Sequence, residues 1–149
     1  MLGGGFYSTR LSIELRKKSG LVYSANSILQ AGRTRGAYYI EYACDPMNVG
    51  KASNIVVQEL RNIQTMPVST DELLRVKALL LRRIPLDESS VMEIAHGLLG
   101  RLELDLPLDE PTIAARRYAQ VSPEQVQSAF QRWIRPTDLV RVTQGPVPQ

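Results

Sequence analysis

Residues 8–44 read STRLSIELRKKSGLVYSANSILQAGRTRGAYYIEYAC, and this stretch decides the fold class. Its first part has the apolar spacing of a helix. Residues 21–29 then alternate in polarity, and residues 37–44 are rich in tyrosine, as strands often are. A polar turn at residues 32–36, with glycine at both ends, separates the two strand-like runs. The pattern predicts a helix followed by an antiparallel hairpin.

The helix of this stretch has a recognisable start, face and end. Ser8 or Thr9 is placed to cap it, while Leu11 and Leu15, with Tyr7 before them, recur every fourth residue and share one face. Its last turn is basic, which complements the carboxyl end of the helix dipole; these residues are Arg16, Lys17 and Lys18. Gly20 follows, where a helix end often needs a positive φ.

Helical patterns fill most of the chain after the hairpin. They start at Asp45-Pro46, at Ser69-Thr70-Asp71-Glu72, at Ser90 with Glu93, at Pro111, and at Ser122-Pro123-Glu124-Gln125. Most of these starts are N-cap or capping-box patterns. Pro67, Pro85 and Pro136 are expected to end or kink the helices before them. Residues 139–142 (LVRV) are predicted as a last strand, and residues 145–149 as a frayed tail.

Strands early and late with helices between them predict an α+β fold, an antiparallel sheet packed against helices. A length of 149 residues suits one domain or a domain fragment. Three strands are few for so much helix. A further strand from another segment or chain would complete the sheet. Self-association of this chain is one way to supply such a strand.

Composition excludes several function classes. The chain is 44% hydrophobic and 22% charged, which is ordinary for a globular protein. No apolar run is long enough for a membrane span, and no secretory signal is visible. The net charge of +3 comes from interspersed basic and acidic residues, so a nucleic-acid partner is not expected.

Cysteine and histidine occur once each, as Cys44 and His96. One cysteine excludes an intramolecular disulfide, and one histidine excludes a metal site with two imidazole ligands. A Cys–His catalytic pair is formally open. However, Cys44 ends a tyrosine-rich strand and is expected to be a buried, inert thiol. His96 is expected on a helix near the core.

The order of short motifs resembles the insulinase/pitrilysin family of zinc metallopeptidases, which includes mitochondrial processing peptidases. The matching residues are Leu2-Gly3-Gly4-Gly5, Ser8-Thr9-Arg10-Leu11 (with one residue between Ser and Arg), Glu14-Leu15-Arg16, Gly20-Leu21-Val22-Tyr23, Asp45-Pro46, the Ser-Thr-Asp-Glu-Leu helix start at residues 69–73, and Val121-Ser122-Pro123-Glu124-Gln125-Val126. No single motif is decisive, but together they span nearly the whole chain.

The resemblance implies a pair of similar domains that close around a peptide. One domain of each pair carries an inverted zinc motif, His-x-x-Glu-His, which a chain with a single histidine cannot contain. The chain therefore resembles the second half of the zinc-free, C-terminal inactive domain. It is expected to bind no cofactor itself, with zinc held by a catalytic domain or subunit of the same family.

Two residues carry over from the family as substrate-binding residues, Arg16 and Tyr23. A guanidinium offers a fork of donors to peptide carbonyls, and a phenol can donate to an oxyanion that forms at a zinc-bound carbonyl. The alternative is that Arg16 only complements a helix end and Tyr23 is a core residue. Gly3, Gly4 and Gly5 are weaker candidates, because glycines at a helix start also serve tight packing.

The resulting hypothesis is a non-catalytic, substrate-binding half of a zinc-dependent metalloendopeptidase. The alternative from another class is a structural or assembly subunit, since related core proteins of respiratory complexes keep the fold without proteolysis. An unrelated enzyme that uses Cys44 or His96 is a third and remote reading. One cysteine suits both the cytoplasm and the periplasm, so the compartment stays undetermined.

Overall fold

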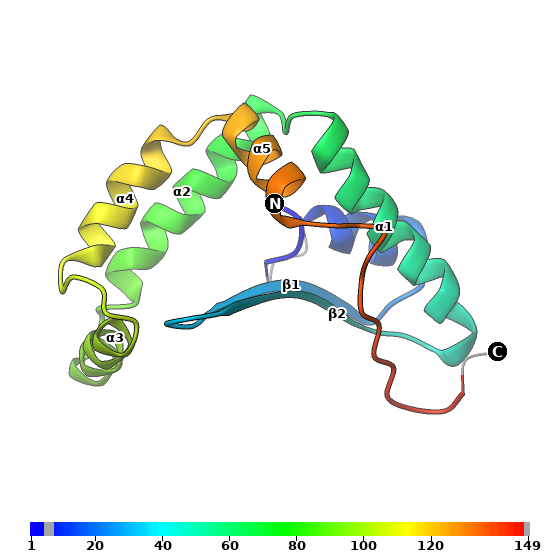
Figure 1. Ribbon diagram of the computed structural model, residues 1–149, viewed down its shortest axis with the longest axis horizontal. Coiled ribbons are helices and arrows are strands. Elements are labelled where there is room, and N and C mark those ends of the chain that lie inside the picture. Colours follow the sequence, from blue (N-terminus) through cyan, green and yellow to red (C-terminus); the bar gives the residue numbers. More distant parts are fainter. Residues whose placement is uncertain (5–7, 148–149) are drawn as a thin grey trace.

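The computed structural model of the chain describes residues 1–4 and 8–147. In chain order its elements are the π-helix η1 (Ser12–Lys18), strands β1 (Ser24–Ala31) and β2 (Gly36–Ala43), the 3₁₀-helix η2 (Pro46–Asn48), and the α-helices α1 (Val49–Thr65), α2 (Thr70–Leu86), α3 (Val91–Glu103), α4 (Glu110–Gln120) and α5 (Pro123–Trp133). Figure 1 shows the hairpin along one side of the molecule, with η1 between it and α1. Helices α2, α3 and α4 lie toward one end. The predicted α+β class is confirmed.

The hairpin is antiparallel, as predicted, and its register pairs Ser24 with Ala43 and Ala31 with Gly36. The first strand starts three residues later than expected. Leu21 is still part of the helix end, because its backbone N–H donates to the Leu15 carbonyl over 2.8 Å. Residues 21–23 therefore form a connection between η1 and β1 rather than the first turn of a strand.

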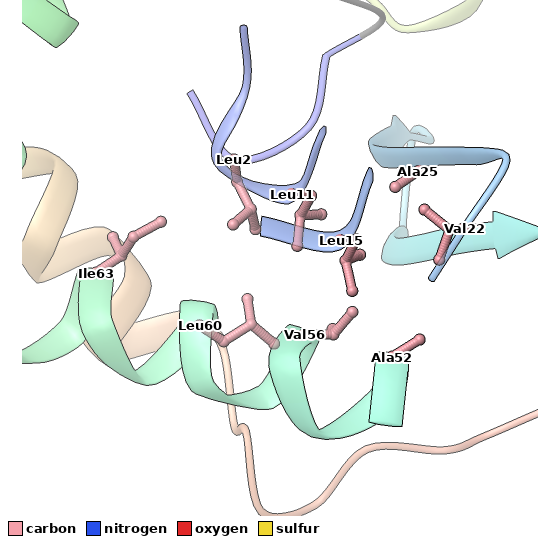
Figure 2. Packing of buried hydrophobic residues seen from close by; sticks show 9 residues of the cluster. All are labelled: Leu2, Leu11, Leu15, Val22, Ala25, Ala52, Val56, Leu60 and Ile63. Atoms are coloured by element: carbon pink, nitrogen blue, oxygen red, sulfur yellow. The ribbon is translucent and has the colours of Figure 1, made fainter. Parts of the chain in front are cut away.

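The core lies where η1, β1 and α1 meet. Leu11 and Leu15 are completely buried, so the predicted face of the first helix is confirmed for these two residues; Tyr7 lies outside the described residues. Figure 2 shows the cluster of Leu2, Leu11, Leu15, Val22, Ala25, Ala52, Val56, Leu60 and Ile63. The buried apolar residues of α1 in this cluster are three or four positions apart, as the stripe of a helix face requires.

Helix α5 packs against α1 and is fixed there by hydrogen bonds. Gln64 of α1 donates to the carbonyls of Phe130 and Ile134 over 2.9 and 2.8 Å. Its own carbonyl accepts from the amides of Gln127 and Gln131. The capping box predicted at Ser122 and Gln125 is present and starts α5. Four hydrogen bonds and an apolar face therefore hold this helix against the core.

The helices α2 and α4 pack on each other, and α3 has no buried residue. Helix α2 starts with the predicted Ser69 cap, whose hydroxyl accepts from the Glu72 backbone N–H. The Glu72 carboxylate is bonded to the Arg10 guanidinium by both oxygens, at 3.1 and 2.7 Å. This charge-assisted pair ties the start of α2 to the amino-terminal segment.

Three local predictions need correction. Residues 139–142 form no strand, and Val140 is 93% and Val142 89% exposed, so the prediction of a last strand is wrong for this described segment. A strand needs a sheet edge, and neither β1 nor β2 pairs with this segment. Of the two outcomes expected at Pro85, a helix end is wrong, because α2 runs to Leu86. His96 is exposed on α3 rather than near the core.

Candidate functional site

The turn between η1 and β1 positions the two sequence-predicted site residues. Gly20 has a φ of +61°, which an L side chain adopts only with strain. Its backbone N–H donates to the Arg16 carbonyl over 3.1 Å. The chain turns within these few residues, so Arg16 lies in the last turn of η1 on one side and Tyr23 lies directly before β1 on the other. Both side chains are exposed.

Tyr23 is an exposed ring that is held at both ends. Its side chain is 66% exposed, which contradicts the alternative interpretation of a core residue. The backbone N–H donates to the Ala43 carbonyl over 2.8 Å, and the phenol donates to Oδ1 of Asp45 over 2.9 Å. This hydrogen bond and the negative charge of Asp45 raise the pKa of the Tyr23 phenol above its ordinary value.

Asp45 is the site residue that sequence reasoning missed. It was assigned as a helix N-cap, and it does precede Pro46 at the start of η2 with extended backbone angles. Its side chain makes no capping hydrogen bond. A local sequence pattern has no signal for its actual contact, because Tyr23 lies 22 residues earlier in the chain.

Arg16 lies in the basic last turn of η1, together with Lys17 and Lys18. This position fits the alternative interpretation, in which the cation complements the carboxyl end of the helix. Lys18 is engaged in a 2.7 Å ion pair with Glu14 one turn earlier. The helix end therefore presents an exposed, positively charged surface beside the Tyr23 turn.

The glycines differ from one another. Gly3 is buried, and a Cβ there would lie 2.8 Å from the Ser27 backbone nitrogen and 3.1 Å from Leu11 Cδ1. Its carbonyl accepts hydrogen bonds from the backbone N–H and hydroxyl of Ser27, so this glycine packs against β1. Gly4 is exposed with open space around it. Gly5 lies outside the described residues.

The described residues were also compared with what a metal site needs. No group of three or more His, Cys, Asp or Glu side chains in residues 1–4 and 8–147 is arranged to hold a metal ion. Cys44 is partly buried against the core, and burial raises the pKa of its thiol. It follows the end of β2, whereas His96 lies on α3 at the opposite end of the molecule (Figure 1). A Cys–His catalytic pair is therefore excluded.

A pocket of about 410 Å³ lies between the end of α2, the start of α3 and the start of α4, away from the Tyr23 turn. Charged side chains of both signs line it, among them Arg83, Asp87, Glu93 and Arg101. His96 lies in this lining.

In the described part of the chain, no helix is both long and apolar enough to cross a membrane.

Comparison with known proteins identifies the class. The sequence model of the peptidase M16 inactive domain matches residues 1–80. Because the match covers more than half of the chain, the chain belongs to this family. The predicted resemblance to the inactive domain of insulinase-like zinc peptidases is confirmed.

Solved structures show the same fold at low sequence identity. The peptidase M16 inactive domain from Pseudomonas fluorescens is 24% identical with a TM-score of 0.71 over 91% of this chain and 32% of that one. The periplasmic protease PqqL from Escherichia coli is 19% identical with a TM-score of 0.64 over 83% and 14%. A chain of complex III₂ from Candida albicans, with Inz-5 bound, is 16% identical with a TM-score of 0.69 over 85% and 30%.

The chain therefore spans about a third of the length of the Pseudomonas fluorescens domain. No curated protein matched it.

Proposed function

We propose that this chain is the non-catalytic, substrate-binding half of a zinc-dependent metalloendopeptidase. It closes over a peptide that a zinc-bearing domain or subunit of the same family holds. The observation that carries this proposal is membership of the peptidase M16 inactive domain family, with only one histidine in the chain. Similarity to a periplasmic protease adds support. Zinc and its ligands belong to the partner, and this chain alone hydrolyses nothing.

Arg16 and Tyr23 are the residues proposed to contact the peptide. Both are exposed beside one turn, and the Tyr23 ring is fixed by hydrogen bonds at its backbone and its phenol. A fixed group binds with little loss of side-chain entropy, which favours affinity. The Arg16 guanidinium supplies donors for peptide carbonyls. The space beside Gly4 is open, so a peptide can approach it. The space beside Gly3 is filled by the backbone of β1.

Residues 1–149 are proposed to form one structural unit, corresponding to the second half of a zinc-free peptidase-family domain. The shared core of η1, the hairpin and α1 supports a single unit. The unpaired residues 139–142 and the two-stranded sheet of the described part are consistent with further strands from a neighbouring segment or chain.

The second candidate function is a structural or assembly subunit that keeps the fold without proteolysis. The observation that favours it is the similarity to a chain of complex III₂. A structural role needs the folded scaffold but not the exposed pair Arg16 and Tyr23. The two candidates therefore differ in what substitutions at the Tyr23 turn do to peptide cleavage.

The deciding experiment measures peptide cleavage by this chain reconstituted with its zinc-bearing partner. The variants are Arg16→Ala and Tyr23→Phe, with Lys17→Ala as the matched control, since Lys17 is exposed in the same helical turn. We expect kcat/KM to fall about tenfold or more for each site variant, because each loses a substrate hydrogen bond, and to stay unchanged for Lys17→Ala. Unchanged cleavage in all three variants would favour the structural subunit.

A further inference from the structure

Asp45 has a side chain in a capping position that does not cap. Its backbone is extended and Pro46 follows it, which is the arrangement of an N-cap residue. Nevertheless its carboxylate makes no hydrogen bond to the helix and instead accepts the Tyr23 phenol over 2.9 Å. An aspartate at this position could cap the helix that follows. In this fold its carboxylate instead accepts a hydrogen bond from a residue of another segment.

The effect of this contact is to fix an exposed aromatic ring. Tyr23 keeps 66% of its side chain exposed, so burial does not hold it. The backbone hydrogen bond to Ala43 fixes its Cα, and the hydrogen bond to Asp45 fixes the far end of the ring. Ala43 and Asp45 both lie at the end of β2, so one short segment orients the whole residue.

The hydrogen-bonding capacity left on Tyr23 follows from its chemistry. A phenol has one proton to donate and oxygen lone pairs to accept with. The proton is donated to Asp45, so the phenol oxygen faces solvent as an acceptor, next to a negative charge. This environment favours a donor such as a peptide backbone N–H and disfavours a carbonyl oxygen or an oxyanion.

We propose that Asp45 is a positioning residue that fixes the Tyr23 ring and makes its phenol oxygen an acceptor for a backbone N–H of the bound peptide. The contact with peptide rests on the proposed function, whereas the Asp45–Tyr23 pair does not. Tyr23 is then a substrate-recognition residue.

The first arm of the test uses the full chain labelled with ¹³Cζ-tyrosine, with the Tyr23 resonance assigned through Tyr23→Phe. The pKa of Tyr23 is measured in the wild type, Asp45→Ala and Asp45→Asn. Glu41→Ala is the matched control, because Glu41 is an exposed carboxylate on β2 that bonds Asn26 instead. We expect the pKa to fall in Asp45→Ala, to fall less in Asp45→Asn, which keeps an acceptor, and to stay unchanged in Glu41→Ala. Equal values in the wild type and Asp45→Ala would overturn the pair.

The second arm measures cleavage by the reconstituted enzyme, using a peptide substrate and a series of copies with one N-methylated amide each. We expect Asp45→Ala to raise KM about two- to tenfold with kcat little changed, and Asp45→Asn to restore most of it. At one position, N-methylation should raise KM in the wild type but not in Tyr23→Phe. Equal N-methylation effects in both enzymes at every position overturn the acceptor role.

The two failures are distinguishable. If Tyr23→Phe leaves cleavage unchanged while the titration shows the Asp45–Tyr23 pair, the proposed substrate role of Tyr23 has failed and the acceptor role falls with it. If Tyr23→Phe impairs cleavage but Asp45→Ala does not, the substrate role of Tyr23 stands and the positioning role of Asp45 is overturned.

Discussion

At the scale of single residues, two glycines set the geometry around the candidate site. Gly3 brings the amino-terminal segment against β1, because only a hydrogen fits beside the Ser27 backbone nitrogen. Gly20 lets the chain turn from η1 into the hairpin with its φ of +61°. Together they fix where η1 lies relative to β1. Tyr23 depends on this arrangement because it follows Gly20 by three residues.

Gly3→Ala should lower the free energy of unfolding by about 1–3 kcal/mol, because the new methyl group would lie 2.8 Å from backbone and 3.1 Å from the buried Leu11 side chain. Urea denaturation followed by circular dichroism measures this loss. Gly4→Ala is the matched control, since nothing lies within 4 Å of a Cβ at Gly4. Equal stability of the two variants would contradict the packing of Gly3 against β1.

The hydrogen bond between Tyr23 and Asp45 depends on pH through the ionisation of the Tyr23 phenol. Its pKa is raised by the hydrogen bond to Asp45, so the protonated phenol is favoured in the folded chain. The stabilisation by this bond is complete below the ordinary pKa of tyrosine and is lost as the pH rises through the raised value. Substrate binding that depends on the fixed ring should therefore weaken in alkaline solution, which KM measured against pH would detect. A loss of binding near neutral pH would point to another group.

At the scale of elements, capping patterns and the hairpin were predictable because their interactions are local. Ser69, Ser90 and Ser122 all accept the backbone hydrogen bond that their spacing predicts. The strand at residues 139–142 was predicted wrongly, because a strand depends on a neighbour that local patterning cannot supply. Similarly, the alternative interpretation makes Tyr23 a core residue, but the connection from η1 leaves Tyr23 exposed and buries Val22.

The cap of α5 offers a clean test of a local element. Ser122→Ala removes the hydroxyl that accepts from the Gln125 backbone N–H, and it should reduce the free energy of unfolding by about 1 kcal/mol. Thermal or urea unfolding measures the difference. Ser128→Ala, on the exposed part of the same helix, should have little effect. If both substitutions destabilised the chain equally, the cap would not be the cause.

The element α1 carries the core, and its contribution can be measured in the same way. Leu60 is 1% exposed and lies in the cluster with Leu11 and Leu15. Leu60→Ala should reduce the free energy of unfolding by about 2–5 kcal/mol, through lost burial and a residual cavity. Leu29→Ala is the control, because Leu29 on β1 is 73% exposed. A small effect at Leu60 would mean that the core lies elsewhere.

At the scale of the whole molecule, the core and the candidate site share their supports. The segment that buries Leu11 and Leu15 also carries Arg16 in its last turn and leads into Tyr23. The order of motifs predicted this family and this pair of residues, but not the role of Asp45. Its partner is distant in the chain and becomes a neighbour only when the hairpin folds. The candidate site is therefore built next to the buried core.

The most direct test of the central proposal is a measurement of zinc content and peptide cleavage for three samples: this chain alone, its zinc-bearing family partner alone, and the two together. The proposal predicts that the chain alone holds no stoichiometric zinc and cleaves nothing, and that adding it to the partner raises kcat/KM by at least tenfold. Stoichiometric zinc with cleavage by the chain alone would contradict the proposal. So would a partner that cleaves at its full rate without the chain.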